Sequence, residues 1–103
     1  MVALNELGPN QFEIKLDKTF DFETHKEFRQ IIKDVMAKNP QSLHLNFGEV
    51  EYLDSSALGM LMLAKHESDA RNCAIAITQL KDGHARKVLE LVKFQHFTCM
   101  SIF

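Results

Sequence analysis

The stretch from residue 50 to residue 63 constrains the fold of this chain more than any other. An extended, largely apolar segment at 50–53 is followed by Asp54, Ser55 and Ser56, and then by a helical run that is apolar almost all round. A helix of that kind buries itself in the core of a globular protein. The polar side chains are therefore left at a strand-to-helix turn, and we expect the function of the protein to lie there.

Length and composition are those of an ordinary globular protein, and we expect a single domain over residues 1–103. The 103 residues are near the common domain size, and the 46% hydrophobic and 25% charged content argues against disorder. The formal net charge is -2, whereas a nucleic-acid-binding domain usually shows a clear basic excess. We therefore expect no nucleic-acid partner.

Neither a membrane span nor a secretion signal is evident in the sequence. No apolar run approaches the roughly 20 residues that span a bilayer, and the first residues lack the basic-then-apolar layout of a signal peptide. We expect a cytoplasmic protein that does not insert into a membrane. Cys73 and Cys99 both fall in apolar, strand-like stretches, where we expect free buried thiols rather than a disulfide.

Alternating or continuous apolar runs predict the strands. Residues Phe12, Ile14 and Leu16 fall on one face of a segment, the pattern of a strand with one side buried. A turn signal at 8–10 predicts a hairpin between this strand and the preceding segment. The predicted strands are 2–7, 11–16, 42–47, an interior strand at 73–78 and a last strand at 97–103 beside it.

Three segments change to the helical period. In the first, about 22–38, apolar residues recur at three- and four-residue spacings, with Asp21 as the expected N-cap. The second runs over about 56–71, where Asn72 can end it in the left-handed conformation, and the third spans about 84–92. The order ββαβαβαβ predicts an α/β fold: a mostly parallel β-sheet with an N-terminal antiparallel hairpin and about three to four helices packed on it.

The sequence offers little support for an enzyme. It contains no nucleotide-binding glycine motif and no G-x-S-x-G turn, and its four glycines are well separated. A hydrolase built on Ser55 would need a histidine base that the fold brings to it, which stays open as an alternative. We expect no catalytic residue, no cofactor and no metal site, because the histidines are scattered without ligand spacing: His25, His44, His66, His84 and His96.

The polar triplet admits two interpretations. A hydroxyl at a helix start is usually an N-cap, which accepts a hydrogen bond from an amide of the first turn. The other interpretation is a phosphorylation site, because the free amides and the positive dipole end of a helix N-terminus stabilise a phosphate. Phosphorylation would add about -1.5 to -2 charges beside Asp54, so a partner bound at this surface would be repelled without a change of fold.

The residues of this region resemble the signature of the STAS domain. More narrowly, they are similar to the bacterial anti-sigma factor antagonists, in which a hydrophobic residue and Asp-Ser-Ser/Thr-Gly-Leu-Gly follow a strand. The resemblance covers essentially the whole chain, although the matches outside the core motif are weak individually. Ala57 stands where the family usually has glycine. The matching residues are Leu45-Asn46-Phe47, Val50 and Tyr52-Leu53-Asp54-Ser55-Ser56-Ala57-Leu58-Gly59.

The resemblance implies a partner switch that regulates transcription. In such proteins the unphosphorylated antagonist binds an anti-sigma factor, commonly a serine kinase of the histidine-kinase-like ATPase fold, and so frees a sigma factor. The kinase phosphorylates the first serine after the aspartate, here Ser55, with Ser56 as the alternative hydroxyl. The complex then dissociates, and a PP2C-type serine phosphatase reverses the step. The protein itself is expected to be a monomer or weak dimer.

The same resemblance implies a partner-binding surface around the phosphorylated serine, with Ser56 capping the second helix. The alternative is a STAS domain with another task, as a subunit of a lipid or anion transport assembly or of a larger signalling complex. The serine is then only a structural cap or contact, and phosphorylation in the presence of a kinase separates the two hypotheses. The expected contact residues are Asp21, Asp54, Ser55, Ser56, Leu58, Met62 and Lys65.

Overall fold

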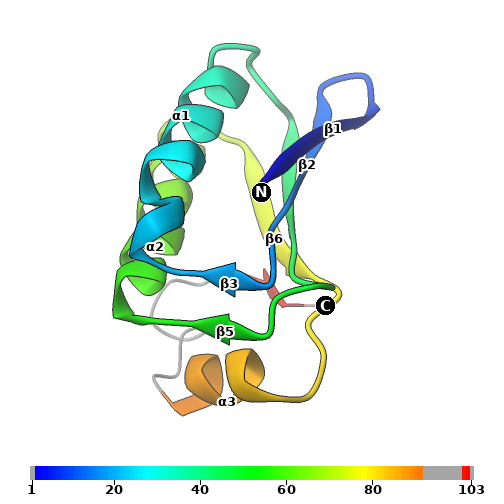
Figure 1. Ribbon diagram of the computed structural model, residues 1–103. Helices are drawn as coiled ribbons and strands as arrows, with labels where there is room; N and C mark the ends of the chain where they lie inside the picture. Colours follow the sequence, from blue (N-terminus) through cyan, green and yellow to red (C-terminus); the bar gives the residue numbers. More distant parts are fainter. Residues whose placement is uncertain (1, 92–100, 103) are drawn as a thin grey trace.

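Two β-sheets, one large and one small, organise the chain in this computed structural model, which describes residues 2–91 and 101–102 (Figure 1). In chain order the elements are β1 (Ala3–Gly8), β2 (Gln11–Lys15), β3 (Thr19–Phe20), η1 (Phe22–Thr24), α1 (His25–Met36), β4 (Ser42–Asn46), β5 (Tyr52–Leu53), α2 (Ser55–Ala70), β6 (Ala74–Thr78), α3 (His84–Leu91) and β7 (Ser101–Ile102). Helices α1 and α2 lie side by side on one face of the large sheet, and α3 lies next to the small one.

The large sheet has the strand order β1-β2-β4-β6-β7. β1 and β2 form an antiparallel hairpin, whereas β2, β4, β6 and β7 pair in parallel. This confirms the predicted α/β class, a mostly parallel sheet that starts with an antiparallel hairpin. It also confirms that 73–78 contains an interior strand, and that the last strand, described at Ser101–Ile102, lies beside it.

The core lies between the large sheet and the two helices α1 and α2. Ile14, Leu45 and Ile77 are aligned across neighbouring strands and are fully buried, because alternate side chains of each strand face the helices. An apolar stripe of α1 that includes Phe28 and Ile32 packs against them. The helical spacing of these residues in the sequence predicts this stripe.

Asparagines in the left-handed conformation follow the two longest helices. Asn39 has φ 52° after α1, and Asn72 has φ 55° after α2, a conformation that asparagine adopts more readily than most residues with a β-carbon. The predicted end of the second helix at Asn72 is therefore confirmed. The third helix, α3, agrees with the predicted 84–92, although Val92 lies outside the described residues.

The structure differs from the predicted elements in two places. The first predicted helix starts with a 3-10 turn, η1, before it continues as α1. In addition, β3 and β5 form a separate parallel sheet. Two residues per strand are too few to show an alternating pattern, so apolar periodicity does not predict this sheet.

Cys73 is buried and free, as the sequence predicts. Burial raises the pKa of its thiol, with an opposing effect from the Ser68 side chain. The thiol is therefore protonated and unreactive near neutral pH. Cys99 and the rest of the predicted strand segment 97–100 lie outside the described residues.

Candidate functional site

The small sheet brings two helix N-termini together. β3 and β5 lie side by side (Figure 1) and pair in parallel with Phe20 opposite Leu53. The residues that follow, Asp21 and Asp54, therefore lie at the same edge of the small sheet. The Asp54 amide donates a hydrogen bond to the Phe20 carbonyl oxygen at 3.4 Å, which extends the pairing by one residue. Segments far apart in the sequence therefore start η1 and α2 side by side.

Buried side chains anchor this sheet in the core. Phe20 is 1% exposed, and its ring centroid lies 5.1 Å from that of Phe28 and 6.1 Å from that of Phe47. Leu53 on the neighbouring strand is also 1% exposed. Because each buried residue directly precedes one of the two aspartates, packing in the core determines where both helices begin.

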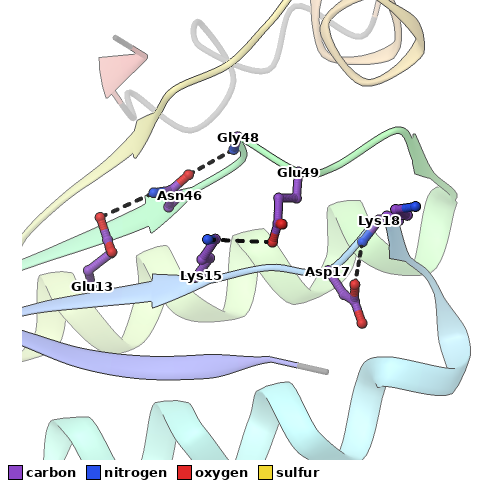
Figure 2. A network of polar contacts seen from close by, with 7 residues as sticks. All are labelled: Glu13, Lys15, Asp17, Lys18, Asn46, Gly48 and Glu49. Atoms are coloured by element: carbon purple, nitrogen blue, oxygen red, sulfur yellow. Dashed lines mark hydrogen bonds and ion pairs between the residues drawn. The ribbon is translucent and has the colours of Figure 1, made fainter.

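A polar network supports the turn that leads into β5 (Figure 2). The Asn46 side chain donates through Nδ2 to Glu13 Oε2 at 3.3 Å and accepts through Oδ1 from the Gly48 amide at 2.8 Å. Lys15 Nζ lies 3.6 Å from Glu49 Oε2. A β-carbon on Gly48 would lie 3.0 Å from Asn46 Oδ1, so glycine suits this close approach. The network ties the ends of β2 and β4 to the turn and positions the segment that enters the site.

Asp21 is the N-cap of η1, as the sequence predicts. Its carboxylate accepts a hydrogen bond from the Glu23 amide at 3.0 Å, and Thr24 Oγ1 accepts one from the Asp21 amide at 3.3 Å. The Thr24 hydroxyl also donates to the Asp21 carbonyl oxygen at 2.8 Å. This reciprocal arrangement is a capping box, and it engages the side chains of Asp21 and Thr24.

Asp54 is the N-cap of α2, in place of Ser56, so the prediction that Ser56 caps this helix is wrong. Asp54 Oδ1 accepts hydrogen bonds from the Ala57 amide at 3.0 Å and from the Ser56 hydroxyl at 2.6 Å. Ser56 already lies inside the first turn, because α2 begins at Ser55. The extended backbone of Asp54, with φ -116° and ψ -176°, is the conformation in which a side chain reaches the first-turn amides.

These contacts hold the pKa of Asp54 below its ordinary value of 3.8. The hydrogen bond from the Ser56 side chain lowers the pKa most, burial opposes it, and the backbone amides of Ala57, Phe22 and Ser56 lower it further. The Phe22 amide belongs to the other helix start, so both helix starts contribute to the lowered pKa of Asp54. Asp54 is therefore ionised at neutral pH and places a fixed negative charge beside Ser55.

The two adjacent serines differ in what their hydroxyls do. The Ser56 hydroxyl donates to the Asp54 carboxylate and is only partly exposed. Ser55 is exposed at the first position of α2, and its hydroxyl makes no hydrogen bond in the described part of the chain. The structure therefore leaves Ser55, and not Ser56, with a hydroxyl that is both accessible and uncommitted.

The other expected contact residues of α2 share one face with Ser55. Leu58, Met62 and Lys65 follow it at spacings of three, four and three residues, which places them along one side of a helix. Leu58 is half-buried, Met62 is 41% exposed, and Lys65 Nζ pairs with Asp69 Oδ1 at 2.9 Å. The fold thus brings the expected residues into one patch that runs from the small sheet along α2.

Ala57 occupies the position that is usually glycine in the family that the sequence resembles. It is fully buried, so its methyl group packs in the core and does not cover the exposed Ser55 hydroxyl. Its amide still donates to Asp54 at 3.0 Å. The substitution therefore leaves both the helix cap and the access to Ser55 intact.

Two exposed aromatic residues flank the site and escape the sequence analysis. Phe22 is 73% exposed and stacks on His25 at 5.9 Å between ring centroids, whereas Tyr52 is 46% exposed and stacks on His84 at 4.9 Å. His84 Nε2 lies 3.2 Å from the Leu53 carbonyl oxygen. Aromatic side chains are frequent anchors of protein interfaces. The sequence feature that could have identified these two residues is their position beside the two N-cap aspartates.

The described residues contain neither a metal-binding cluster nor a helix that could span a membrane. Within 2–91 and 101–102, no group of three or more histidine, cysteine, aspartate or glutamate side chains is placed to hold a metal ion. None of the helices in that part of the chain has the length and apolar character to cross a membrane.

Comparison with known proteins relates this geometry to a family. A family model described as "Mlab, STAS domain" matches residues 5–100. The chain is also 30% identical over 95 residues to a STAS-domain containing protein of Pseudomonas aeruginosa (strain UCBPP-PA14), a match that covers 92% of each chain. The chain belongs to the STAS-domain family.

Solved structures of low sequence identity share the fold of this STAS domain. The anti-sigma factor antagonist SpoIIAA in its unphosphorylated form gives a TM-score of 0.78 at 15% identity, covering 100% of this chain and 87% of that one. Phosphorylated Bacillus SpoIIAA gives 0.75 at 17% identity, covering 100% and 91%. A sulfate transporter family protein from Wolinella succinogenes gives 0.78 at 14% identity, covering 91% and 75%. At these identities the likeness shows the fold alone.

Proposed function

We propose that this STAS domain is an anti-sigma factor antagonist, a cytoplasmic binding module without catalytic activity of its own. Its unphosphorylated form binds an anti-sigma factor that is also a serine kinase of the histidine-kinase-like ATPase fold. Phosphorylation of Ser55 releases this partner, and a PP2C-type serine phosphatase restores binding. The protein in this way regulates transcription by partner switching.

The observation that carries the proposal is the difference between the two serine hydroxyls. The Ser56 hydroxyl is bonded to the N-cap carboxylate at 2.6 Å, whereas Ser55 is exposed and its hydroxyl is free of hydrogen bonds in the described residues. A kinase can therefore modify Ser55 without breaking the cap of α2. We assign phosphorylation to Ser55 and keep Ser56 as the alternative hydroxyl.

Charge supplies the mechanism of release. Asp54 is ionised because its pKa is lowered by hydrogen bonds, the Ser56 hydroxyl first among them, and a phosphate on Ser55 adds about -1.5 to -2 charges next to it. The amides and dipole of the α2 N-terminus stabilise this charge, so the domain remains folded. A partner surface that fits the unmodified edge then meets repulsion and a desolvation penalty.

We place the partner over the shared edge of the two helix starts and along α2. There the ionised Asp54, with Asp21 beside it, can pair with cationic groups of the partner. Met62 and the stacked Phe22 are exposed apolar side chains that a partner can cover. The expected contact residues Asp21, Asp54, Ser55, Ser56, Leu58, Met62 and Lys65 all belong to this proposed interface.

The test is the phosphorylation state of the protein purified from its own host. We expect intact-mass measurement and phosphopeptide mapping to find a mixed population that carries one phosphate on Ser55. A PP2C-type phosphatase should return it to the unmodified mass. Phosphate on Ser56 instead would show that the wrong hydroxyl was chosen, and its absence under every growth condition would contradict the switch.

A second function is suggested by the fold shared with the sulfate transporter family protein. In this alternative the chain is a STAS subunit of a lipid or anion transport assembly or of a larger signalling complex. Ser55 is then a simple contact residue, and Asp54 serves only as the helix cap. The domain would stay unphosphorylated in its host and bind its partner under all conditions, which is the opposite of the result expected above.

A further inference from the structure

A groove between α1 and α2 combines apolar side chains with a positively charged rim. Its volume is about 320 Å³. Ala37 after α1 and the half-buried Leu63 of α2 contribute its accessible apolar surface, above the buried Ile32 and Met36, and Arg29 and Lys33 stand on the α1 side. Its lining residues Leu63, Glu67 and Arg71 lie along the later turns and at the end of α2, away from the N-terminal turn that carries the serines.

The cations on the α1 side of this groove are unpaired. Among the described residues, Arg29 and Lys33 form no ion pair or hydrogen bond through their side chains, and both are exposed. Of the charged side chains that line the groove, Arg29, Lys33 and Arg71 are cationic and Glu67 is anionic. The groove is thus locally positive on a chain whose net charge is -2.

A neighbouring hollow extends the positive surface along α1. It shares Arg29 and Lys33 with the groove and adds Lys26 and His25. Lys26, Arg29 and Lys33 are spaced by three and four residues, so they form one stripe of the helix. A stripe of unpaired cations beside an apolar groove favours a partner that carries both carboxylates and apolar side chains.

On the α2 side, the groove contains an internal carboxylate. Arg71 Nη1 pairs with Glu67 Oε2 at 2.8 Å, and the two side chains are 42% and 35% exposed. Pairs with this degree of exposure contribute little free energy, so a carboxylate from a partner can take the place of Glu67 on Arg71. This pair indicates the kind of group that the groove accepts.

The shape of the groove argues for a polypeptide rather than a small anion or a bilayer. Its lining runs over 29–37 on α1 and 63–71 on α2, which at 1.5 Å per residue is a length of about 12 Å. A single headgroup would need only one point of contact, and a flat membrane surface does not follow the hollow between two helices. An amphipathic helix laid along such a groove is a common mode of recognition.

We propose that the α1–α2 groove is a docking surface for an acidic amphipathic helix of a protein partner. The apolar face of that helix packs on Ala37 and Leu63, and its carboxylates pair with Arg29 and Lys33. The interaction uses no atom of Ser55 and does not depend on its phosphorylation. The docking proposal can therefore be tested independently of the proposed phosphorylation switch.

The test titrates the ¹⁵N-labelled full chain with a synthetic helical peptide that has leucine on one face and glutamate on the others. A matched peptide carries lysine in place of glutamate. We expect the glutamate peptide to shift the amide resonances of 29–37 and 63–71, and the lysine peptide to leave them unchanged. Binding of both peptides alike, or shifts confined to another surface, would overturn the proposal.

Charge variants sharpen this test. Arg29→Glu with Lys33→Glu should weaken peptide binding by about tenfold or more, because attraction becomes repulsion. Lys81→Glu with Lys87→Glu makes the same charge change at exposed positions after β6 and on α3, and should alter the affinity by no more than about twofold. An equal loss of peptide affinity in both double variants would show that the net charge of the protein causes the effect, and would overturn the proposal.

Glu67→Gln should change the affinity for the peptide in the opposite direction, towards tighter binding. It removes the internal competitor for Arg71 and should tighten peptide binding severalfold; unchanged or weaker binding would count against the proposed pairing.

Two other occupants of the groove would give different experimental results. Groove-dependent binding to phosphatidylglycerol vesicles without a response to the peptide would assign the groove to a membrane. A dimer lost in the Arg29→Glu, Lys33→Glu variant, again without peptide binding, would assign it to a second copy of this chain.

Discussion

The two helix N-termini that meet at the small sheet have the same type of N-cap but differ in the side chains that follow it. Each starts with an aspartate in extended conformation whose carboxylate accepts a hydrogen bond from a first-turn amide. After Asp21 comes the exposed aromatic Phe22, and the only hydroxyl of that turn, on Thr24, belongs to the capping box. After Asp54 comes Ser55, whose hydroxyl is exposed and unbonded within the described residues.

This difference separates two tasks that a polar residue at a helix start can perform. A hydroxyl that completes a cap, as Thr24 does, cannot be modified without loosening the helix start. In α2 the carboxylate of Asp54 does the capping and also accepts from Ser56, which leaves Ser55 without a structural role in its side chain. The α2 start therefore suits a reversible modification and the η1 start suits a fixed contact surface.

The largest effect is expected when the free hydroxyl is removed. Ser55→Ala should abolish phosphate incorporation by the partner kinase, whereas Ser56→Ala should retain it, because the Ser56 hydroxyl is committed to Asp54. Mass spectrometry after incubation with the kinase gives the readout. Incorporation that persists in Ser55→Ala would remove the distinction between the two serines.

A charge at the same position should mimic the modified state. Ser55→Asp is expected to weaken partner binding by about tenfold or more, because it adds a like charge beside the ionised Asp54. Ser55→Asn, similar in size but neutral, is the matched control and should bind nearly as the wild type does. Isothermal titration calorimetry measures both, and equal affinities would place Ser55 outside the interface.

Removing the two caps tests how alike the helix starts are. Asp54→Ala should lower the free energy of unfolding by about 1–2 kcal/mol and Asp21→Ala by about 0.5–1 kcal/mol. The larger loss is expected at Asp54, because Ser56 also loses its acceptor there. Urea denaturation measures both, with Asp54→Asn as a control that retains a capping oxygen. An equal or reversed order would contradict the assigned difference.

The exposed aromatic residue after Asp21 should contribute to binding and not to folding. Phe22→Ala is expected to weaken partner affinity severalfold, because Phe22 is 73% exposed and available to a partner. Leu7→Ala, at an exposed residue of the distant β1 strand, is the matched control. Thermal denaturation should show little change in either variant, and an equal effect of both on affinity would exclude Phe22 from the interface.

The smallest effect is expected in the dependence of folding stability on pH in the acid range. Hydrogen bonds lower the pKa of Asp54 in the folded state, with the Ser56 hydroxyl as the first cause, so its ionised form favours folding. This contribution is complete above the ordinary value of 3.8 and is lost as the pH falls through the lower folded pKa. Asp54→Asn should therefore flatten the fall in stability in this acid range. A pH series of urea denaturation curves that is identical in both proteins would contradict the shift.

Much of the fold follows from local patterns in the sequence. Alternation at Phe12, Ile14 and Leu16 predicts a half-buried strand, and the structure buries all three side chains. The N-cap at Asp21 and the helix end at Asn72 depend on the chemistry of single residues, so they too are recognised locally. The same holds for the exposed polar turn that begins α2.

The identity of the α2 cap could not be predicted with the same certainty. Asp54, Ser55 and Ser56 are all good N-caps, and a shift of one residue in the helix start exchanges their roles. The pairing of Asp54 with the end of β3, at 3.4 Å between its amide and the Phe20 carbonyl oxygen, decides the register. That partner is remote in the sequence, so no local pattern contains it.

The sequence by itself determined the α/β class and the polar turn before an apolar helix, because both depend on short-range spacing and residue type. Only the tertiary structure decided that a sheet of two short strands places both aspartate caps at one edge, that Ser56 is bonded while Ser55 is free, and that unpaired cations of α1 line a groove against α2. Each of these depends on contacts between distant segments, which the packing of the whole core sets.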